Sequence, residues 1–93
     1  MNPDRPSILC VDDDPDVLTF LEVVLSGAGY RFSRGASTRE GLELFQRERP
    51  ALVIADLMME EIDSGLTFAR ELAALGNRAP IYLLSSVGDQ LDQ

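Results

Sequence analysis

The chain has 93 residues, 45% of them hydrophobic, and its 8 basic and 16 acidic residues give a formal net charge of -8. This size supports at most one compact domain with a modest core. The negative charge argues against a nucleic-acid backbone or an anionic membrane as the direct partner, because both are anionic themselves. All the basic residues are arginine. The 93 residues therefore contain no histidine for a proton relay and no lysine for a P-loop.

The single cysteine, Cys10, lies in an apolar run and cannot form a disulfide within the chain. It is interpreted as a small core residue in a reducing compartment. Residues 1–6 contain no apolar segment typical of a signal peptide, and no uninterrupted apolar span approaches membrane length. We therefore expect a soluble, cytoplasmic protein.

The first predicted element is a strand over residues 7–11, an apolar run that ends on three aspartates at positions 12–14. The last of these acids precedes Pro15, an order typical of a helix N-cap followed by proline at the first helical position. The following helix is expected to carry one apolar face, made by Val17, Leu21, Val24 and Ala28. Gly27 and Gly29 are expected to end it.

The same alternation continues along the chain. Residues 30–33 alternate apolar and polar side chains, as a strand near a sheet edge does. Residues 37–40, Ser-Thr-Arg-Glu, match a capping box that opens a second helix. Residues 51–56, Ala-Leu-Val-Ile-Ala-Asp, are predicted to be a buried strand that ends on a carboxylate. An acidic loop leads to a third helix that Gly76 closes, and residues 79–84 form the fourth predicted strand.

Strands and helices in this order predict an α/β fold with a doubly wound parallel sheet. In such sheets the functional crevice lies beyond the carboxyl ends of the strands. Asp12, Asp13, Asp56 and Ser85 all fall on that edge. If the first and third strands are neighbours, at a spacing of about 4.8 Å, their terminal carboxylates converge within reach of one cation.

Clustered carboxylates repel one another unless a positive charge lies among them, and no lysine or histidine is nearby. A hard divalent cation bound by oxygen atoms, above all Mg²⁺, is the expected counterion. Such an ion would allow an anionic phosphoryl group to approach a carboxylate nucleophile, for which Asp56 is the candidate. The Ser85 hydroxyl, one residue past the fourth strand, would be placed to donate a hydrogen bond to a phosphoryl oxygen.

Three motifs carry a resemblance to a known family. They are Ile-Leu-Cys-Val-Asp-Asp-Asp-Pro at residues 8–15, Leu-Val-Ile-Ala-Asp-Leu-Met-Met at residues 52–59 with Asp63 and Gly65 after it, and Pro-Ile-Tyr-Leu-Leu-Ser at residues 80–85. Together they span nearly the whole chain, which resembles the receiver domain of bacterial two-component response regulators. The resemblance implies a flavodoxin-like fold.

The resemblance also implies roles for individual residues. Asp56 would be the phosphoacceptor, Asp13 would bind Mg²⁺ directly, and Asp12 would bind it partly through water. The main-chain carbonyl of Met58 would be a further metal ligand, and Ser85 would be the switch hydroxyl. The phosphoryl donor would be a phosphohistidine on a sensor histidine kinase or a histidine phosphotransfer protein. Such a domain is a signalling module rather than an enzyme, and it catalyses at most its own aspartyl phosphorylation and dephosphorylation.

The sequence departs from the family pattern in three ways. Receivers normally continue into a fifth strand that ends in a lysine and then a last helix, and this chain has neither. Glu60 stands where the family has a proline, and the loop from Glu60 to Gly65 is one residue longer than usual. We expect residues 1–93 to form a single receiver domain that is incomplete at its C-terminus, with a natural short variant as the alternative. The fourth strand would then expose an edge through which a homodimer could form.

Two other functions compete with phosphorylation signalling. The first is an interaction module of the same fold whose recognition is constitutive because the lysine is missing. The second is a haloacid-dehalogenase-like phosphohydrolase that uses Asp12. This chain lacks the later lysine and the cap of that family, and the hypothesis leaves Asp56 without a role. Each signal also has a purely structural interpretation. The helix dipole favours acids before the first turn of a helix, and Ser85 could start a turn.

Overall fold

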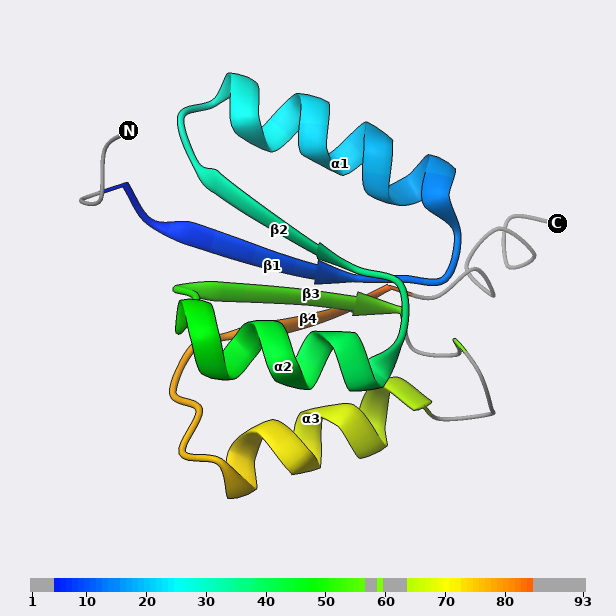
Figure 1. Ribbon diagram of the computed structural model, residues 1–93, viewed down its shortest axis with the longest axis vertical. Coiled ribbons are helices and arrows are strands. Elements are labelled where there is room, and N and C mark those ends of the chain that lie inside the picture. The colour runs from blue at the N-terminus through cyan, green and yellow to red at the C-terminus, as the bar shows by residue number, and fades with distance from the viewer. Residues whose placement is uncertain (1–4, 57–58, 60–63, 85–93) are drawn as a thin grey trace, which may run out of the picture.

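The computed structural model describes residues 5–56, 59 and 64–84, which alternate between strands and helices (Figure 1). The elements are β1 (Ser7–Val11), α1 (Pro15–Gly27), β2 (Arg31–Gly35), α2 (Thr38–Glu48), β3 (Leu52–Asp56), α3 (Ser64–Ala74) and β4 (Ile81–Leu84). This order confirms the predicted alternation. The second strand begins one residue later than expected and continues to Gly35.

The strands form one parallel sheet in the order β2-β1-β3-β4. α1 covers one face of the sheet, and α2 and α3 cover the other (Figure 1). The predicted doubly wound parallel sheet is therefore confirmed. The first and third strands are neighbours, which is the condition for their terminal carboxylates to converge. The strand order matches the first four strands of the flavodoxin-like arrangement.

Two apolar clusters hold the layers together, one on each face of the sheet. The larger lies beneath α2 and α3 and contains Leu9, Val11, Phe45, Val53, Ala55, Met59, Phe68 and Leu72. The smaller lies beneath α1 and contains Ile8, Cys10 and Leu18. Because β1 supplies side chains to both clusters, all of its residues are buried. Burial on both faces explains why its sequence is a continuous apolar run.

The buried face of α1 is rotated relative to the prediction. Leu18 is 3% exposed, and Leu21 and Leu25 pack against the same cluster. Val24, by contrast, is 49% exposed. The contact stripe of the helix therefore runs through positions 18, 21 and 25, spaced three and then four residues apart. The prediction that Val24 and Ala28 belong to the buried face is wrong, since Ala28 is also exposed.

The N-terminal ends of the first two helices follow the predicted capping motifs. The Asp14 carboxylate accepts a hydrogen bond of 2.9 Å from the Asp16 amide. The Ser37 hydroxyl accepts one of 3.2 Å from the Glu40 amide, and the Glu40 carboxylate accepts one of 2.8 Å from the Ala36 amide. These contacts satisfy amides that have no partner inside a helix. No helix in the described part of the chain is long and apolar enough to cross a bilayer.

The β4 strand is the last in the order of the described sheet. Ile81 and Leu83 pack against the larger cluster, whereas Tyr82, on the opposite face, is 61% exposed. Residues 85–93 lie outside the described part of the chain.

Candidate functional site

Three carboxylates meet at the carboxyl edge of the sheet. Asp12 and Asp13 follow β1 directly, and Asp56 is the last residue of β3. Val11 pairs with Ala55 in the register of these two parallel strands, so the chain leaves both strands at the same level. One carboxylate oxygen from each acid lies within 4.8 Å of the others. The sheet therefore brings together the three acids for which the sequence predicts convergence.

The three acids differ in their surroundings. Asp12 is 5% exposed, Asp56 is half-buried and Asp13 is exposed. The Asp12 amide donates a 3.0 Å hydrogen bond to the Gly35 carbonyl, and its Oδ1 accepts one of 2.9 Å from the Asp14 amide. These bonds fix both the backbone and the side chain of Asp12. Asp13 and Asp56 remain open to solvent in part, so a ligand can reach the cluster.

The electrostatics of the cluster favour a bound cation. Burial is the largest cause that raises the pKa of the Asp12 carboxyl above its ordinary value. The hydrogen bond from the Asp14 amide lowers that pKa, and the negative charges of Asp56, Asp13 and Asp14 raise it. Burial and the negative charges nearby thus disfavour the ionised form of Asp12. A positive charge among the carboxylates would remove this repulsion.

Asp14, the third acid of the run, has a different role. Its Oδ1 caps the start of α1 by accepting the Asp16 amide at 2.9 Å. Its carbonyl accepts the Leu18 amide at 3.2 Å, which closes the first helical turn. The structure therefore separates the acids by role: two point to the cluster and one starts the helix. The sequence predicted this cap from the order of Asp14 and Pro15.

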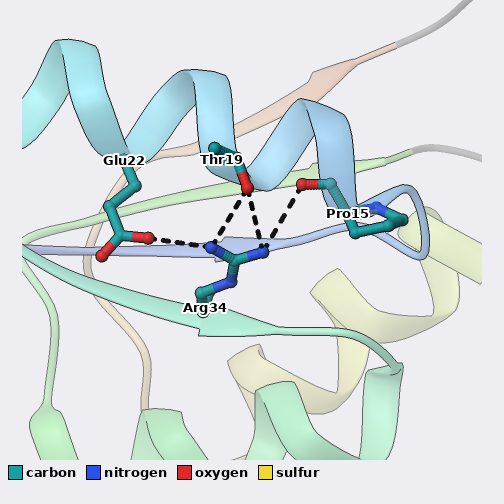
Figure 2. Close-up of polar contacts among 4 residues, drawn as sticks. All are labelled: Pro15, Thr19, Glu22 and Arg34. Carbon is teal, nitrogen blue, oxygen red and sulfur yellow. Dashed lines mark hydrogen bonds and ion pairs between the residues drawn. The ribbon is translucent and has the colours of Figure 1, made fainter.

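An arginine that the sequence did not single out lies beside the site. Arg34, on β2, lines a pocket of about 320 Å³ together with Asp12, Asp13, Pro15, Leu18 and Ala36. Figure 2 shows its guanidinium directed at α1, between Pro15 and Glu22. The period of two in a strand could have indicated this side, because Phe32, two residues earlier, belongs to the α1 cluster.

Two of the candidate site residues cannot be placed. Met58 and Ser85 both lie outside the described residues, so the predicted carbonyl ligand and switch hydroxyl stay predictions. Met59, the next residue, is buried at 8% exposure in the larger cluster. The Met59 side chain therefore contributes to the packing of the core.

The chain matches the response regulator receiver domain family over residues 8–93. It is 36% identical over 87 residues to the transcriptional regulatory protein AfsQ1 of Streptomyces coelicolor, an alignment that covers 94% of this chain and 38% of that protein. The chain thus spans well under half the length of the curated relatives it matches.

Solved structures agree with this assignment. A response regulator receiver domain protein from Clostridium thermocellum has a TM-score of 0.81 at 26% identity, covering 94% of this chain and 70% of that one. The response regulator TrrA from Thermotoga maritima, solved in complex with Mg²⁺-BeF, has a TM-score of 0.78 at 34% identity, covering 87% of this chain and 70% of that one. With the family match, the four-stranded parallel sheet and the acids at its carboxyl edge, the chain belongs to the response regulator receiver domain family.

Proposed function

We propose that this chain is a phosphoacceptor module of two-component signal transduction, in which Asp56 takes a phosphoryl group with the help of Mg²⁺. The observation that carries the proposal is the convergence of Asp12, Asp13 and Asp56, whose nearest carboxylate oxygens lie within 4.8 Å of one another. Like charges at this distance, one of them buried, are stabilised by a cation between them. The response regulator TrrA from Thermotoga maritima was solved in complex with Mg²⁺-BeF, which supports the choice of Mg²⁺ as the cation.

The residues present suit Mg²⁺, because carboxylates and a backbone carbonyl are the hard oxygen ligands it prefers. Asp12, Asp13 and Asp56 would hold it together with the main-chain carbonyl of Met58. Bound there, Mg²⁺ would neutralise charge on the oxygens of the transferring phosphoryl group. The 2.9 Å hydrogen bond from the Asp14 amide holds one Asp12 oxygen, so the other oxygen is left to face the cation or its water shell.

Asp56 is suited to act as the nucleophile. It ends β3, and its pairing with Leu84 of β4 holds its backbone in the sheet. One oxygen of Asp56 would form a bond to phosphorus while the phosphorus–nitrogen bond of a donor phosphohistidine breaks, and the released imidazole would take a proton from solvent. Ser85 follows the strand partner of Asp56, and we propose that its hydroxyl donates a hydrogen bond to a phosphoryl oxygen.

The wider biological role follows from the same proposal. Residues 1–93 would act as a single receiver domain in the cytoplasm, catalysing only its own aspartyl phosphorylation and dephosphorylation. The donor would be a sensor histidine kinase or a histidine phosphotransfer protein, with no direct contact to nucleic acid or membrane. We also propose that two copies associate through the edge of β4, the last strand in the order of the described sheet.

The second candidate is a constitutive interaction module of the same fold. Asp56 would then bind no phosphate, or would bind it without consequence for partners. The phosphohydrolase alternative using Asp12 gains no support from the family match and leaves Asp56 unused.

Titration with Mg²⁺ and then beryllofluoride, a phosphoryl mimic, tests the proposal. Isothermal calorimetry should give one Mg²⁺ per chain, followed by tight beryllofluoride binding that requires Mg²⁺. Asp56→Asn should abolish beryllofluoride binding, and Asp13→Asn should weaken Mg²⁺ at least tenfold. Asp16→Asn is the matched control, because Asp16 is an exposed acid of the first turn of α1 outside the cluster.

The outcomes separate the candidates. Beryllofluoride binding that depends on Asp56 supports the receiver function. Mg²⁺ binding without any beryllofluoride binding, in a chain that still captures its partner, supports the constitutive module. Loss of the adduct on replacing Asp12, with no effect from replacing Asp56, would point to the phosphohydrolase.

A further inference from the structure

The Arg34 side chain ties β2 to the first two turns of α1 (Figure 2). Its Nη1 donates a 2.8 Å hydrogen bond to Glu22 Oε1, which is also an ion pair. Both terminal nitrogens lie 3.4 Å from Thr19 Oγ1, and Nη2 lies 3.4 Å from the Pro15 carbonyl oxygen. The three acceptors are spaced four and three residues apart, so they lie on one stripe of the helix. Only the planar fork of a guanidinium can contact all three at once.

These contacts lie at the far end of the loop that carries two of the acids. The loop from Asp12 to Asp14 is fixed on its strand side by β1 and by the 3.0 Å bond between the Asp12 amide and the Gly35 carbonyl. On its helix side it is continuous with Pro15, the first residue of α1. The position of α1 along the sheet therefore decides where Asp13 lies relative to Asp56.

The apolar contact of α1 with the sheet is a narrow stripe of Leu18, Leu21 and Leu25. Leu18 is its single buried side chain among the described residues, while Phe20, Val23 and Val24 are all exposed. Such a stripe fixes the face that α1 turns to the sheet, whereas directional polar contacts also fix its position along β2. The polar contacts of Arg34, which span from Pro15 to Glu22, oppose movement of α1 along β2 at the end nearest the acids.

We propose that Arg34 is a positioning residue for the acidic cluster: it holds the N-terminal turns of α1 against β2 and so keeps Asp13 at the spacing from Asp56 that a divalent cation requires. This inference rests on the proposed function, since it assigns the residue that supports the proposed Mg²⁺ site.

Arg34 also has an electrostatic effect of the opposite sign, which makes the inference sharply testable. Its positive charge lines the same pocket as Asp12 and Asp13. If charge alone mattered, removing Arg34 would strengthen Mg²⁺ binding, because a competing cation would leave. If positioning dominates, removing Arg34 weakens Mg²⁺ binding. The two effects therefore predict changes in opposite directions for the same substitution.

The experiment measures the Kd for Mg²⁺ by calorimetry in Arg34→Met, Arg34→Lys and Thr19→Val. We expect Kd to rise about tenfold in Arg34→Met, the lower end of the range found when groups that orient metal ligands are removed. Arg34→Lys keeps the charge without the fork and should also weaken binding, by less than Arg34→Met does. Thr19→Val removes an acceptor without changing charge, so it tests positioning even if the arginine variants fold poorly.

Arg47→Met is the matched control, because Arg47 forms an exposed ion pair with Glu48 at the end of α2. It should leave the Kd for Mg²⁺ unchanged. Amide hydrogen exchange in metal-free protein gives a second readout. In Arg34→Met the Leu18 amide, which bonds the Asp14 carbonyl, should exchange faster, while the Ala28 amide at the other end of the helix should not.

Each result decides between the two proposals. Weaker Mg²⁺ binding in all three variants, with faster exchange at Leu18, supports the positioning role. Binding as tight as wild type, or tighter, in Arg34→Met and Thr19→Val overturns it while leaving the Mg²⁺ site itself intact. Failure of the wild-type chain to bind Mg²⁺ overturns the proposed function, and the positioning role falls with it.

Discussion

Replacing Asp56 by asparagine should make the metal-free protein more stable. The substitution keeps the size and shape of the side chain and removes one negative charge from the cluster. Asp56 faces Asp12 and Asp13 with oxygen distances of up to 4.8 Å. Its neutralisation therefore removes two repulsive pairs and leaves the pair between Asp12 and Asp13.

The size of the effect follows from Coulomb's law. Two unit charges 4.8 Å apart repel by about 3.5 kcal/mol at an effective dielectric constant of about 20, and by about 0.9 kcal/mol in bulk water. Asp13 is exposed, so solvent screening places its pair with Asp56 near the lower value. Asp12 is buried and Asp56 half-buried, so their pair lies somewhat above that value. We expect the free energy of unfolding to rise by about 2 kcal/mol. For a domain of this size, that change raises Tm by roughly 8–16 °C.

Urea denaturation in EDTA, with Asp56→Asn and wild type side by side, measures the difference. Glu43→Gln is the control, because Glu43 is an exposed acid of α2 paired with Arg39 and lies outside the cluster; its effect should stay within about 0.5 kcal/mol. Mg²⁺ at about a hundred times its Kd should then stabilise wild type by about 2.7 kcal/mol. The asparagine variant should gain much less.

If the metal-free Asp56→Asn variant is no more stable than wild type, repulsion among the three carboxylates does not destabilise the metal-free protein. The cluster would then be relaxed without a cation, and repulsion among its acids would give no reason for one to bind. Equal stabilisation of both proteins by Mg²⁺ would place the cation elsewhere.

Four further predictions concern the protonation of Asp12, the packing at Gly41 and at Gly27, and the reactivity of Cys10. Because the pKa of Asp12 is raised from 3.8, the folded state binds a proton more readily than the unfolded state. The metal-free protein should therefore lose stability as pH rises through that raised pKa, relative to Asp12→Asn, and saturating Mg²⁺ should cancel the loss. Gly41→Ala should destabilise by about 1–2 kcal/mol, since the new Cβ would lie 2.8 Å from Phe68 Cζ and overpacking outweighs the gain in helix propensity. Gly27→Ala, whose Cβ meets nothing within 4 Å, should be neutral or stabilising in the same denaturation assay. Burial, aided by the charge of Asp12, raises the pKa of the Cys10 thiol to about 12, so maleimide should label it at pH 8 only after unfolding.

The convergence of the acids was predictable because it depends on few assumptions. A parallel sheet places the ends of its strands on one edge, and the two apolar runs ending at Val11 and Ala55 end at the same level in the register. The cap at Asp14 was also predictable from adjacent residues, because aspartate is preferred at the N-cap and proline at the first helical position. Both features follow from neighbours in the sequence and from one rule of sheet topology.

The rotation of α1 and the role of Arg34 could not be predicted in the same way. Val24 fits an apolar helical stripe as well as Leu25 does, and only packing on the sheet decides that Leu25 is the one in contact. The contacts of Arg34 join residues 12 to 19 positions away in the chain. They depend on where α1 crosses β2, which no local pattern of residues specifies. The tight approach of Gly41 to Val11 and Phe68 has the same origin.

The position of the covalent phosphoryl adduct shows directly whether Asp56 accepts the phosphoryl group. The protein is incubated with Mg²⁺ and acetyl phosphate, trapped with borohydride, digested with trypsin and sequenced by mass spectrometry. Trypsin does not cut before proline, so Asp56 falls in the peptide of residues 48–70 and Asp12 in that of residues 1–31. We predict a Mg²⁺-dependent reduction product at Asp56, located by fragmentation because Asp63 shares its peptide. A product at Asp12, or none at Asp56 under conditions where Mg²⁺ binds, would show that Asp56 is not the phosphoacceptor.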